Sequence, residues 1–283
     1  MRISSYYRPD GKATFGLEAG DEILDADDSF LATYPSLQAV LASGALGHLK
    51  EAASGFKKVD RKDVSFLPPI VRPGKIICIG LNYRAHVAET GREQPKYPSI
   101  FTRYPESLVG CDQPLIRPKA SDKFDYEGEL AVVIGTAGRA ISAAQAMNHV
   151  AGYCCFNDGS IRDFQRHTSQ FWAGKNFNQS GSMGPTLVTP EEIGDLAELT
   201  LETRLNGEVM QRTSVGDLLF DVPALIEYLS TVVELSPGDV IATGTPSGVG
   251  LFREPPVWMK PGDQVEVKIS KVGTLANQIE QDR

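Results

Sequence analysis

The sequence predicts an α+β fold rich in strands, with a small N-terminal α+β domain and a larger second domain. Short apolar patterns that alternate with polar residues and end at turn residues recur along the chain, as is typical of strands. Helical spacing is confined to a few separate segments. The run from Pro68 to Gly74 holds too many prolines for a helix or a central strand, so we place the boundary there, between residues 1–70 and residues 71–283.

Length, composition and charge limit the classes of function. The 283 residues can bury a sizeable core, and 41% hydrophobic and 23% charged residues are ordinary for a soluble globular protein. The net charge of −8 argues against a nucleic-acid partner and against a membrane-surface partner. A small anionic substrate would need a local positive site, such as a metal ion with Lys or Arg. No segment approaches the roughly 18 apolar residues of a membrane span and no signal-peptide run begins the chain, so we expect a cytoplasmic protein.

The four cysteines, Cys78, Cys111, Cys154 and Cys155, form no Cys-x-x-Cys pair. Neighbouring residues on a strand face opposite sides, so Cys154 and Cys155 cannot both reach one ion. This spacing argues against zinc and favours reduced, buried thiols in a cytosolic protein.

The N-terminal domain concentrates no catalytic residue types. A hairpin-type turn at Asp10-Gly11 and two strand patterns, residues 14–18 and 22–25, predict a small meander. Residues 37–49 have helical spacing. We therefore interpret this part of the chain as an accessory domain.

A buried strand at residues 75–79 leads into the first candidate catalytic pair. Asn82 as N-cap and Gly91 just past the end predict a short helix between them. His86 and Glu89 are three residues apart on that helix, so their side chains can meet. A carboxylate beside an imidazole raises its basicity and fixes its tautomer, which suits a general base. The alternative is a surface His–Glu pair, although the position after a strand favours function.

Arg103 lies in an extended, proline-flanked segment, residues 98–110. Its guanidinium could clamp a substrate carboxylate through two parallel hydrogen bonds. Alternatively, its stem covers an edge strand and the charge stays in water.

The strand pattern that follows residue 124 carries two acids on a face that becomes apolar. Glu127 and Glu129 point the same way as Ala131 and Val133, because side chains alternate along a strand. Two like charges this close repel, and burying them is costly without a counter-charge. Hard cations such as Mg²⁺ and Ca²⁺ prefer oxygen ligands and would neutralise the pair. The alternative is a sheet edge whose acids lie in water.

Two further charged residues follow a second buried strand, residues 152–156. Asp158 directly follows that strand, so it either serves the turn or joins Glu127 and Glu129 in a three-carboxylate site. Lys175 is flanked by glycine and small polar residues, a loop that lets an ammonium approach a ligand. The alternative for Lys175 is an exposed position on a mobile loop.

The second half of the chain is mostly strand and turn. Asn206-Gly207 is a hairpin turn between two strand patterns. The remaining elements that periodicity predicts are helices at 142–150 and 222–232 and strands at 240–242 and 265–269.

A glycine-rich loop, residues 243–250, is neither a phosphate-binding Walker A loop nor a dinucleotide fingerprint. It lacks the Gly-Lys-Ser/Thr ending, and no helix follows it. Gly244 and its neighbours could present backbone N–H groups, together with the hydroxyl of Thr245, to a carboxylate.

Taken in order from about Lys75 to Leu275, these segments resemble the fumarylacetoacetate hydrolase family, in its acylpyruvase and hydroxyheptadienedioate isomerase branch. Each motif is weak alone, and the ordered set is specific. The resembling residues are Gly80-Leu81-Asn82-Tyr83 with His86 and Glu89, Asp125 to Leu130, Asn157-Asp158, Arg162-Asp163 with Gln165, Gly174 to Phe177, Gly184-Pro185, Thr243 to Gly250, Pro261-Gly262-Asp263, and Gly273-Thr274-Leu275.

The resemblance implies a mixed β-roll catalytic domain, usually in a homodimer, and a role for each site residue. Gln165 and Thr245 match substrate-contacting positions. Arg103 and Gly244 remain candidates for binding the substrate carboxylate from the chemistry of their own segments. Arg103 stands where many members have lysine, and Ala276 where many have arginine. The implied metal ligands, for Mg²⁺ or Mn²⁺ with Ca²⁺ as a further option, are Glu127, Glu129 and Asp158; the implied catalytic residues are His86, Glu89 and Lys175.

For function, the resemblance implies metal-dependent cleavage of a C–C bond in a small anionic substrate, an acylpyruvate-like or fumarylpyruvate-like 2,4-diketo acid, through a stabilised enolate. The choice of hydrolysis rests on the His86–Glu89 pair, which would activate water. The alternatives on the same site are decarboxylation of oxaloacetate or a related 2-oxo acid and isomerisation of a hydroxy-dienedioate. A hypothesis of another class is a carboxylate-binding protein without catalysis.

Overall fold

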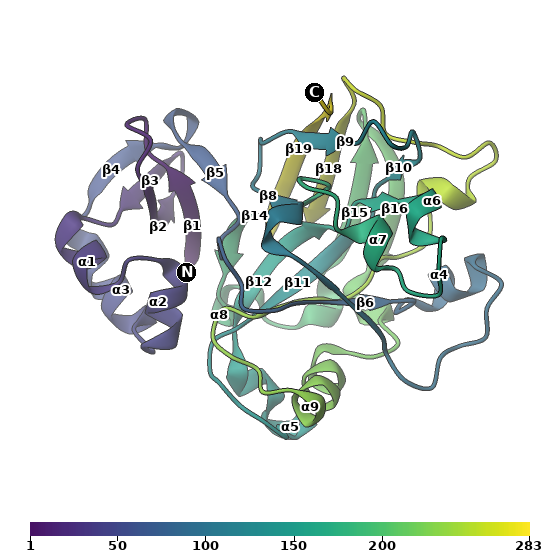
Figure 1. The fold of residues 1–283 in the computed structure, drawn as a ribbon. Coiled ribbons are helices and arrows are strands. Elements are labelled where there is room, and N and C mark those ends of the chain that lie inside the picture. The colour runs from purple at the N-terminus through teal and green to yellow at the C-terminus, as the bar shows by residue number, and fades with distance from the viewer.

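The computed structural model describes all 283 residues and confirms the strand-rich α+β fold (Figure 1). A 12-stranded sheet forms the spine of the molecule. Along it lie β4 (Lys57–Asp60), β3 (Glu22–Asp25), β2 (Ala13–Ala19), β1 (Arg2–Tyr7), β14 (Gly181–Val188), β12 (Val150–Asn157), β11 (Gly128–Ile134), β17 (Val240–Ala242), β6 (Ile76–Gly80) and β7 (Ser99–Arg103), with β5 (Ser65–Leu67) paired to β1 and β8 (Leu108–Val109) paired to β14.

A second sheet of five strands packs against the middle of the first. Its order is β16 (Glu208–Ser214), β15 (Thr200–Leu205), β18 (Gln264–Ile269), β19 (Gly273–Gln281) and β9 (Leu115–Arg117), and β10 (Phe124–Asp125) pairs separately with β13 (Ser160–Ile161). The helices are short: α1 (Asp28–Thr33), α2 (Leu37–Ala42), α3 (Leu46–Ala52), α4 (Arg84–Glu89), α5 (Ala143–Ala146), α6 (Arg162–Gln165), α7 (Trp172–Lys175), α8 (Pro190–Ile193) and α9 (Val222–Val232).

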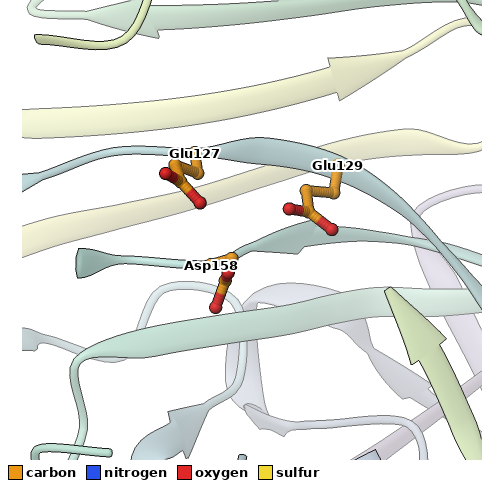
Figure 2. A group of neighbouring side chains, drawn as sticks. All are labelled: Glu127, Glu129 and Asp158. Atoms are coloured by element: carbon orange, nitrogen blue, oxygen red, sulfur yellow. The ribbon is translucent and has the colours of Figure 1, made fainter. Parts of the chain in front are cut away.

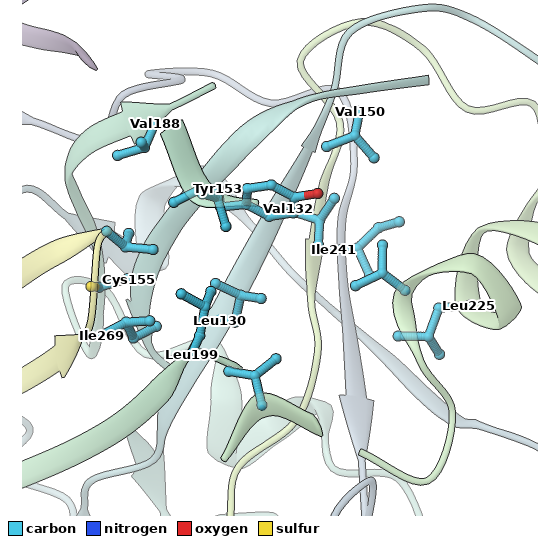
Figure 3. Packing of buried hydrophobic residues seen from close by; sticks show 14 of the residues in the cluster. Leu130, Val132, Val150, Tyr153, Cys155, Val188, Leu199, Leu225, Ile241 and Ile269 are labelled. Atoms are coloured by element: carbon cyan, nitrogen blue, oxygen red, sulfur yellow. The ribbon is translucent and has the colours of Figure 1, made fainter. Parts of the chain in front are cut away.

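The central strands β11 and β12 are buried along their whole length, which explains their continuous apolar sequence. Side-chain alternation divides β11 between two cores. Leu130 and Val132 join the core beneath the second sheet, part of which is drawn in Figure 3, whereas Ala131 and Val133 join the core on the other face. Burial on both faces fixes the register of β11, so the positions of its first residues are fixed as well.

Strand β1 connects the N-terminal part of the chain to the rest. It pairs with β2 on one side and with β14 on the other, where Arg2 lies opposite Val188, so the large sheet runs through both parts. Residues 1–67 nevertheless form a distinct body at one side of Figure 1. The division into domains 1–70 and 71–283 stays a prediction.

Two predicted helices are shorter than their periodicity suggested. Residues 37–49 split into α2 and α3 because Ser43 ends the first helix and Gly44 adopts a φ of +62°. Residues 142–150 form only α5 and a 3₁₀ turn, Met147–His149. No helix of the structure combines the length and the apolar character that a membrane span requires.

The helix predicted after Asn82 forms, but Asn82 is not its cap. Tyr83 is the N-cap of α4, and the amide of Asn82 donates to the carbonyl oxygens of Phe220 and Thr243 at 3.0 and 2.8 Å. Asn82 therefore ties the start of α4 to two distant loops. All four cysteines are free and buried, as the sequence predicted.

Candidate active site

Three carboxylates converge where β11 begins and β12 ends (Figure 2). Gly128 pairs with Asn157, so Glu127 and Asp158 face each other just outside the ladder, and the N–H of Asp158 donates to the carbonyl of Glu127 at 2.8 Å. Glu129 lies on the same face, two residues along. One oxygen from each carboxylate lies within 4.8 Å of the others, and all three residues are buried.

Lys175 forms ion pairs with two members of this triad, which comprises Glu127, Glu129 and Asp158. Its buried ammonium donates to Glu127 and to Asp158, at 2.5 Å in each case. It lies on α7 and is 1% exposed, so the alternative of an exposed lysine on a mobile loop is wrong.

Glu129 is the one triad carboxylate without a cationic partner. Its only hydrogen bond comes from the backbone N–H of Gly244 at 2.8 Å. Gly244 has a φ of +107°, and a Cβ there would meet the side chain of Asn82 at 2.8 Å, so glycine allows this approach. A buried carboxylate with one backbone donor is incompletely compensated.

The pKa values of Glu127 and Glu129 reflect this difference in charge compensation. Burial alone raises the pKa of Glu127, but Lys175 and Arg162 outweigh it and lower that pKa to about 2. Burial, with repulsion from Asp158 and Glu127, raises the pKa of Glu129 well above its usual range. Burial would lower the pKa of Lys175, but Asp158 and Glu127 raise it, so its ammonium stays protonated. Three oxygen donors with one uncompensated charge fit a hard divalent cation.

Without metal, the contribution of Glu129 to the stability of the folded protein is expected to fall as the pH rises. Its folded-state pKa lies above the unfolded value of about 4.5, so between those two values the folded chain holds the additional proton. Stability therefore falls as the pH rises through that window. Urea unfolding in EDTA should show Glu129→Gln gaining stability relative to the wild type as the pH rises above about 4.5. If the difference in the free energy of unfolding between Glu129→Gln and the wild type does not change with pH, the raised pKa of Glu129 is contradicted.

The predicted pair of His86 and Glu89 forms on α4 and faces the same site. Nδ1 of His86 lies 2.8 Å from Oε2 of Glu89, and Oε1 of Glu89 accepts from the N–H of Gly248 at 2.9 Å. The glycine-rich loop thus holds the carboxylate that orients the imidazole, which leaves Nε2 of His86 free. His86 is only 7% exposed, so the alternative of a surface His–Glu pair is not what the structure shows.

These groups share a cavity of about 160 Å³. Its lining includes His86, Glu127, Glu129, Lys175, Gln165 and Thr245. The hydroxyl of Thr245 donates to the carbonyl of Gly128 at 3.1 Å and accepts from Gln211, so it braces the start of β11. The lining does not include Asp158, Gly244 or Arg103.

Arg103, predicted to bind the substrate carboxylate, instead holds Asp158 from behind. Strand alternation turns its side chain into the core, where Nη1 donates to Oδ1 of Asp158 at 2.6 Å and to the carbonyl of Gly159 at 2.9 Å. Nη2 donates to Ser180 and Nε to Ser107, at 2.9 and 3.1 Å. Arg103 is 2% exposed and has no contact that supports the substrate-binding role.

Replacing Arg103 by glutamine should therefore reduce stability before it affects substrate recognition. The change leaves Asp158 buried with one cationic partner fewer, a loss of about 3–5 kcal/mol in the free energy of unfolding. Urea denaturation measures it. The matched control is Arg139→Gln, whose side chain is exposed and has no ion pair, and its stability should be unchanged. A stable Arg103→Gln variant with a raised KM would support the substrate-binding role instead.

Arg162 is a site residue whose role the sequence did not predict. Its Nε donates to Asp125 and its Nη1 contacts Glu127, both at 2.7 Å, while its buried Nη2 has no partner. It lines the cavity beside Gln165, whose side-chain oxygen it also contacts. One sequence feature could have indicated this role: Arg162 and Gln165 are three residues apart on one helix, so their side chains are neighbours.

The chain is similar to known proteins of one family. Residues 75–280 match the family described as "Fumarylacetoacetate (FAA) hydrolase C-terminal". The chain is 43% identical over 221 residues to the mitochondrial oxaloacetate tautomerase FAHD2A of Bos taurus, covering 77% of this chain and 70% of that protein. It is 42% identical over 247 residues to the oxaloacetate tautomerase YisK of Bacillus subtilis, covering 83% and 82%.

One similar solved structure contains a bound metal ion. The maleylpyruvate hydrolase of Sphingobium sp. SYK-6, in complex with manganese(II) and pyruvate, superposes with a TM-score of 0.83 at 27% identity over the full length of both chains. That protein binds a divalent cation together with a 2-oxo acid.

Proposed function

From the premise that the chain belongs to the fumarylacetoacetate hydrolase family, we propose that it is a divalent-metal-dependent oxaloacetate tautomerase. It would interconvert the keto and enol forms of oxaloacetate or a closely related 2-oxo acid. The observation that carries the proposal is the buried triad, in which Glu129 lacks a cationic partner, facing the same cavity as an oriented histidine.

The relatives favour isomerisation over the hydrolysis that the sequence led us to expect. Relatives at 42–43% identity are named oxaloacetate tautomerases, not acylpyruvate hydrolases. Keto–enol interconversion and C–C hydrolysis both pass through an enolate, and hydrolysis additionally needs an attacking water. The chemistry shared by the two reactions therefore depends on the same residues.

Glu127, Glu129 and Asp158 would hold the cation, with Mg²⁺ or Mn²⁺ as the best fit to three oxygen donors. When bound, such a cation supplies Lewis acidity toward the oxygens of a 2-oxo acid. Lys175 and Arg103 position the triad, because they fix Glu127 and Asp158 from the other sides.

His86 is the proposed general base. Its Nδ1 is held by Glu89, so Nε2 is free to take a proton from carbon 3 of the keto form, while the enolate oxygen takes a proton from water. In the reverse direction the enol oxygen gives its proton to water and the imidazolium returns the proton to carbon 3. Glu89 stabilises the imidazolium that forms. Its own position is fixed by the N–H of Gly248, which limits motion of the pair.

Lys175 and Arg162 would stabilise the negative charge of the enolate. The raised pKa of Lys175 keeps it an ammonium, which excludes it as a base and suits electrostatic stabilisation. The unpartnered Nη2 of Arg162 is a buried donor on the cavity lining and suits the substrate carboxylate next to the keto group.

The test is the decay of enol absorbance after enol-form oxaloacetate is added, with Mg²⁺ or Mn²⁺ and with EDTA. We expect the metal-loaded protein to accelerate decay at least about a hundredfold over the metal-free protein, without matching release of CO₂. Matching CO₂ release would identify a decarboxylase. Decay at the buffer rate would reject the proposal and leave the carboxylate-binding hypothesis.

Hydrolysis is the second candidate, because the fold matches that of a maleylpyruvate hydrolase. A panel of acylpyruvates and fumarylpyruvate, followed by loss of the diketo enol band and appearance of pyruvate, measures it. Turnover of these compounds faster than that of oxaloacetate would favour hydrolysis. The homodimer stays a prediction that light scattering can check.

A further inference from the structure

Two arginines on the cavity lining have no partner within the chain. Arg92 and Arg166 both line the cavity and are both exposed. Neither side chain makes a salt bridge or a hydrogen bond, although most other arginines of the chain do. An unpaired guanidinium beside a ligand cavity is a free carboxylate-binding group.

The cations deeper in the cavity are paired with acids of the chain, and the one free donor among them, Nη2 of Arg162, is assigned above to the carboxylate next to the keto group. Lys175 contacts Glu127 and Asp158, and Arg162 contacts Asp125 and Glu127. The positive charge that remains for a second anionic group of a ligand is therefore at the exposed end. In a chain with a net charge of −8, such a pair makes the cavity mouth locally attractive to anions.

Both arginines are attached closely to the elements that carry the site. Arg92 follows Gly91, whose φ of +69° ends the α4 segment that carries His86. Arg166 directly follows Gln165 at the end of α6, and its backbone N–H donates to the carbonyl of Asp163 at 3.0 Å. Both arginines are therefore close in sequence to residues that line the same cavity, His86 and Gln165.

We propose that Arg92 and Arg166 bind the distal carboxylate of a dicarboxylic 2-oxo acid and so select dicarboxylates over monocarboxylates. This rests on the proposed function, which places the 2-oxo acid end of the substrate at the triad. A cavity of about 160 Å³ has room for both ends, since one water occupies about 10–15 Å³ on the same measure. The aromatic lining residues Phe101, Phe171 and Phe252 would contact the carbon chain between them.

The experiment compares oxaloacetate with its 4-methyl ester, which keeps the skeleton and removes the distal charge. In the metal-loaded double variant Arg92→Gln/Arg166→Gln, kcat/KM for oxaloacetate should fall about a hundredfold, mostly through KM, because the lost interaction is binding rather than chemistry. Each single variant should lose about tenfold. For the ester, kcat/KM should fall less than about threefold.

Arg84→Gln is the matched control. Arg84 is an exposed arginine on α4 that does not line the cavity, so its removal changes the net charge as much as each single variant does, without touching the proposed subsite. Its kcat/KM for oxaloacetate should stay within about twofold of the wild type. High salt should reduce the wild type's preference for oxaloacetate over the ester, because exposed charges are screened.

Equal losses for oxaloacetate and the ester, or no loss for either, would overturn the proposal while leaving the proposed function intact. If the wild type turns over neither compound, the proposed function fails. The two compounds then serve as ligands in calorimetric titrations with Mg²⁺. Weaker binding of oxaloacetate alone in the double variant still supports the carboxylate subsite, and unchanged binding rejects it.

Discussion

Replacing Glu129 by glutamine is expected to reduce metal-dependent turnover of oxaloacetate at least about a thousandfold while the metal-free protein stays folded. Glutamine keeps the shape and still accepts the hydrogen bond from Gly244, but it removes the one triad charge that no cation of the chain compensates. Metal affinity should therefore fall, and the cost of burying that charge disappears. The measurements are enol decay with Mg²⁺ and calorimetric titration of Mn²⁺.

Thermal unfolding provides the internal control for this variant. A cation that binds the folded state stabilises it more the higher its affinity, so Mn²⁺ should raise the Tm of the wild type but not that of Glu129→Gln. In EDTA the variant should be at least as stable as the wild type. Glu280→Gln, at an exposed glutamate without an ion pair, should respond to Mn²⁺ like the wild type. Full turnover by Glu129→Gln would remove Glu129 from the metal site.

The second large effect is expected at His86. His86→Asn should lower kcat for enol decay about 10²–10⁴-fold, the usual contribution of a positioned general base, with metal affinity and KM nearly unchanged. Glu89→Gln should have a smaller effect, because it keeps a hydrogen-bonding group beside Nδ1 but no longer stabilises the imidazolium. The pH profile of kcat should change in both variants, whereas a merely structural role would leave it alone.

His48→Asn is the matched control for this series, because His48 is an exposed histidine in residues 1–70. Its kinetics should equal those of the wild type. Turnover by His86→Asn at the wild-type rate would exclude His86 as the base. If His86→Asn stops hydrolysis of diketo acids but spares enol decay, its role is activation of water, and the hydrolase candidate gains over the tautomerase.

Local patterns were sufficient to predict much of the candidate site. The alternation that predicted β11 places Glu127 and Glu129 on one face whatever the rest of the fold does, because the period of a strand is two. His86 and Glu89 meet because residues three apart on a helix are neighbours. Asp158 needed one further step, the antiparallel pairing of two buried strands.

Contacts between segments that are far apart in the sequence could not be predicted from local patterns. Arg103 and Asp158 are 55 residues apart, and nothing in the local pattern distinguishes an inward arginine that holds an acid from one that binds a substrate. Lys175 and Glu127 are 48 residues apart, so the burial of that lysine follows from how α7 packs against β7 and β13. The single helix predicted at residues 37–49 was wrong for a local reason. Gly44 adopts the left-handed conformation and interrupts the helix, and the spacing of apolar residues does not reveal such a residue.

Diffraction from crystals of the protein grown with Mn²⁺, recorded at an energy where manganese scatters anomalously, tests the central claim most directly. We predict one strong anomalous peak in contact with carboxylate oxygens of Glu127, Glu129 and Asp158, and loss of that peak in Glu129→Gln. A peak that contacts other residues, or no peak at a saturating concentration of Mn²⁺, would contradict it.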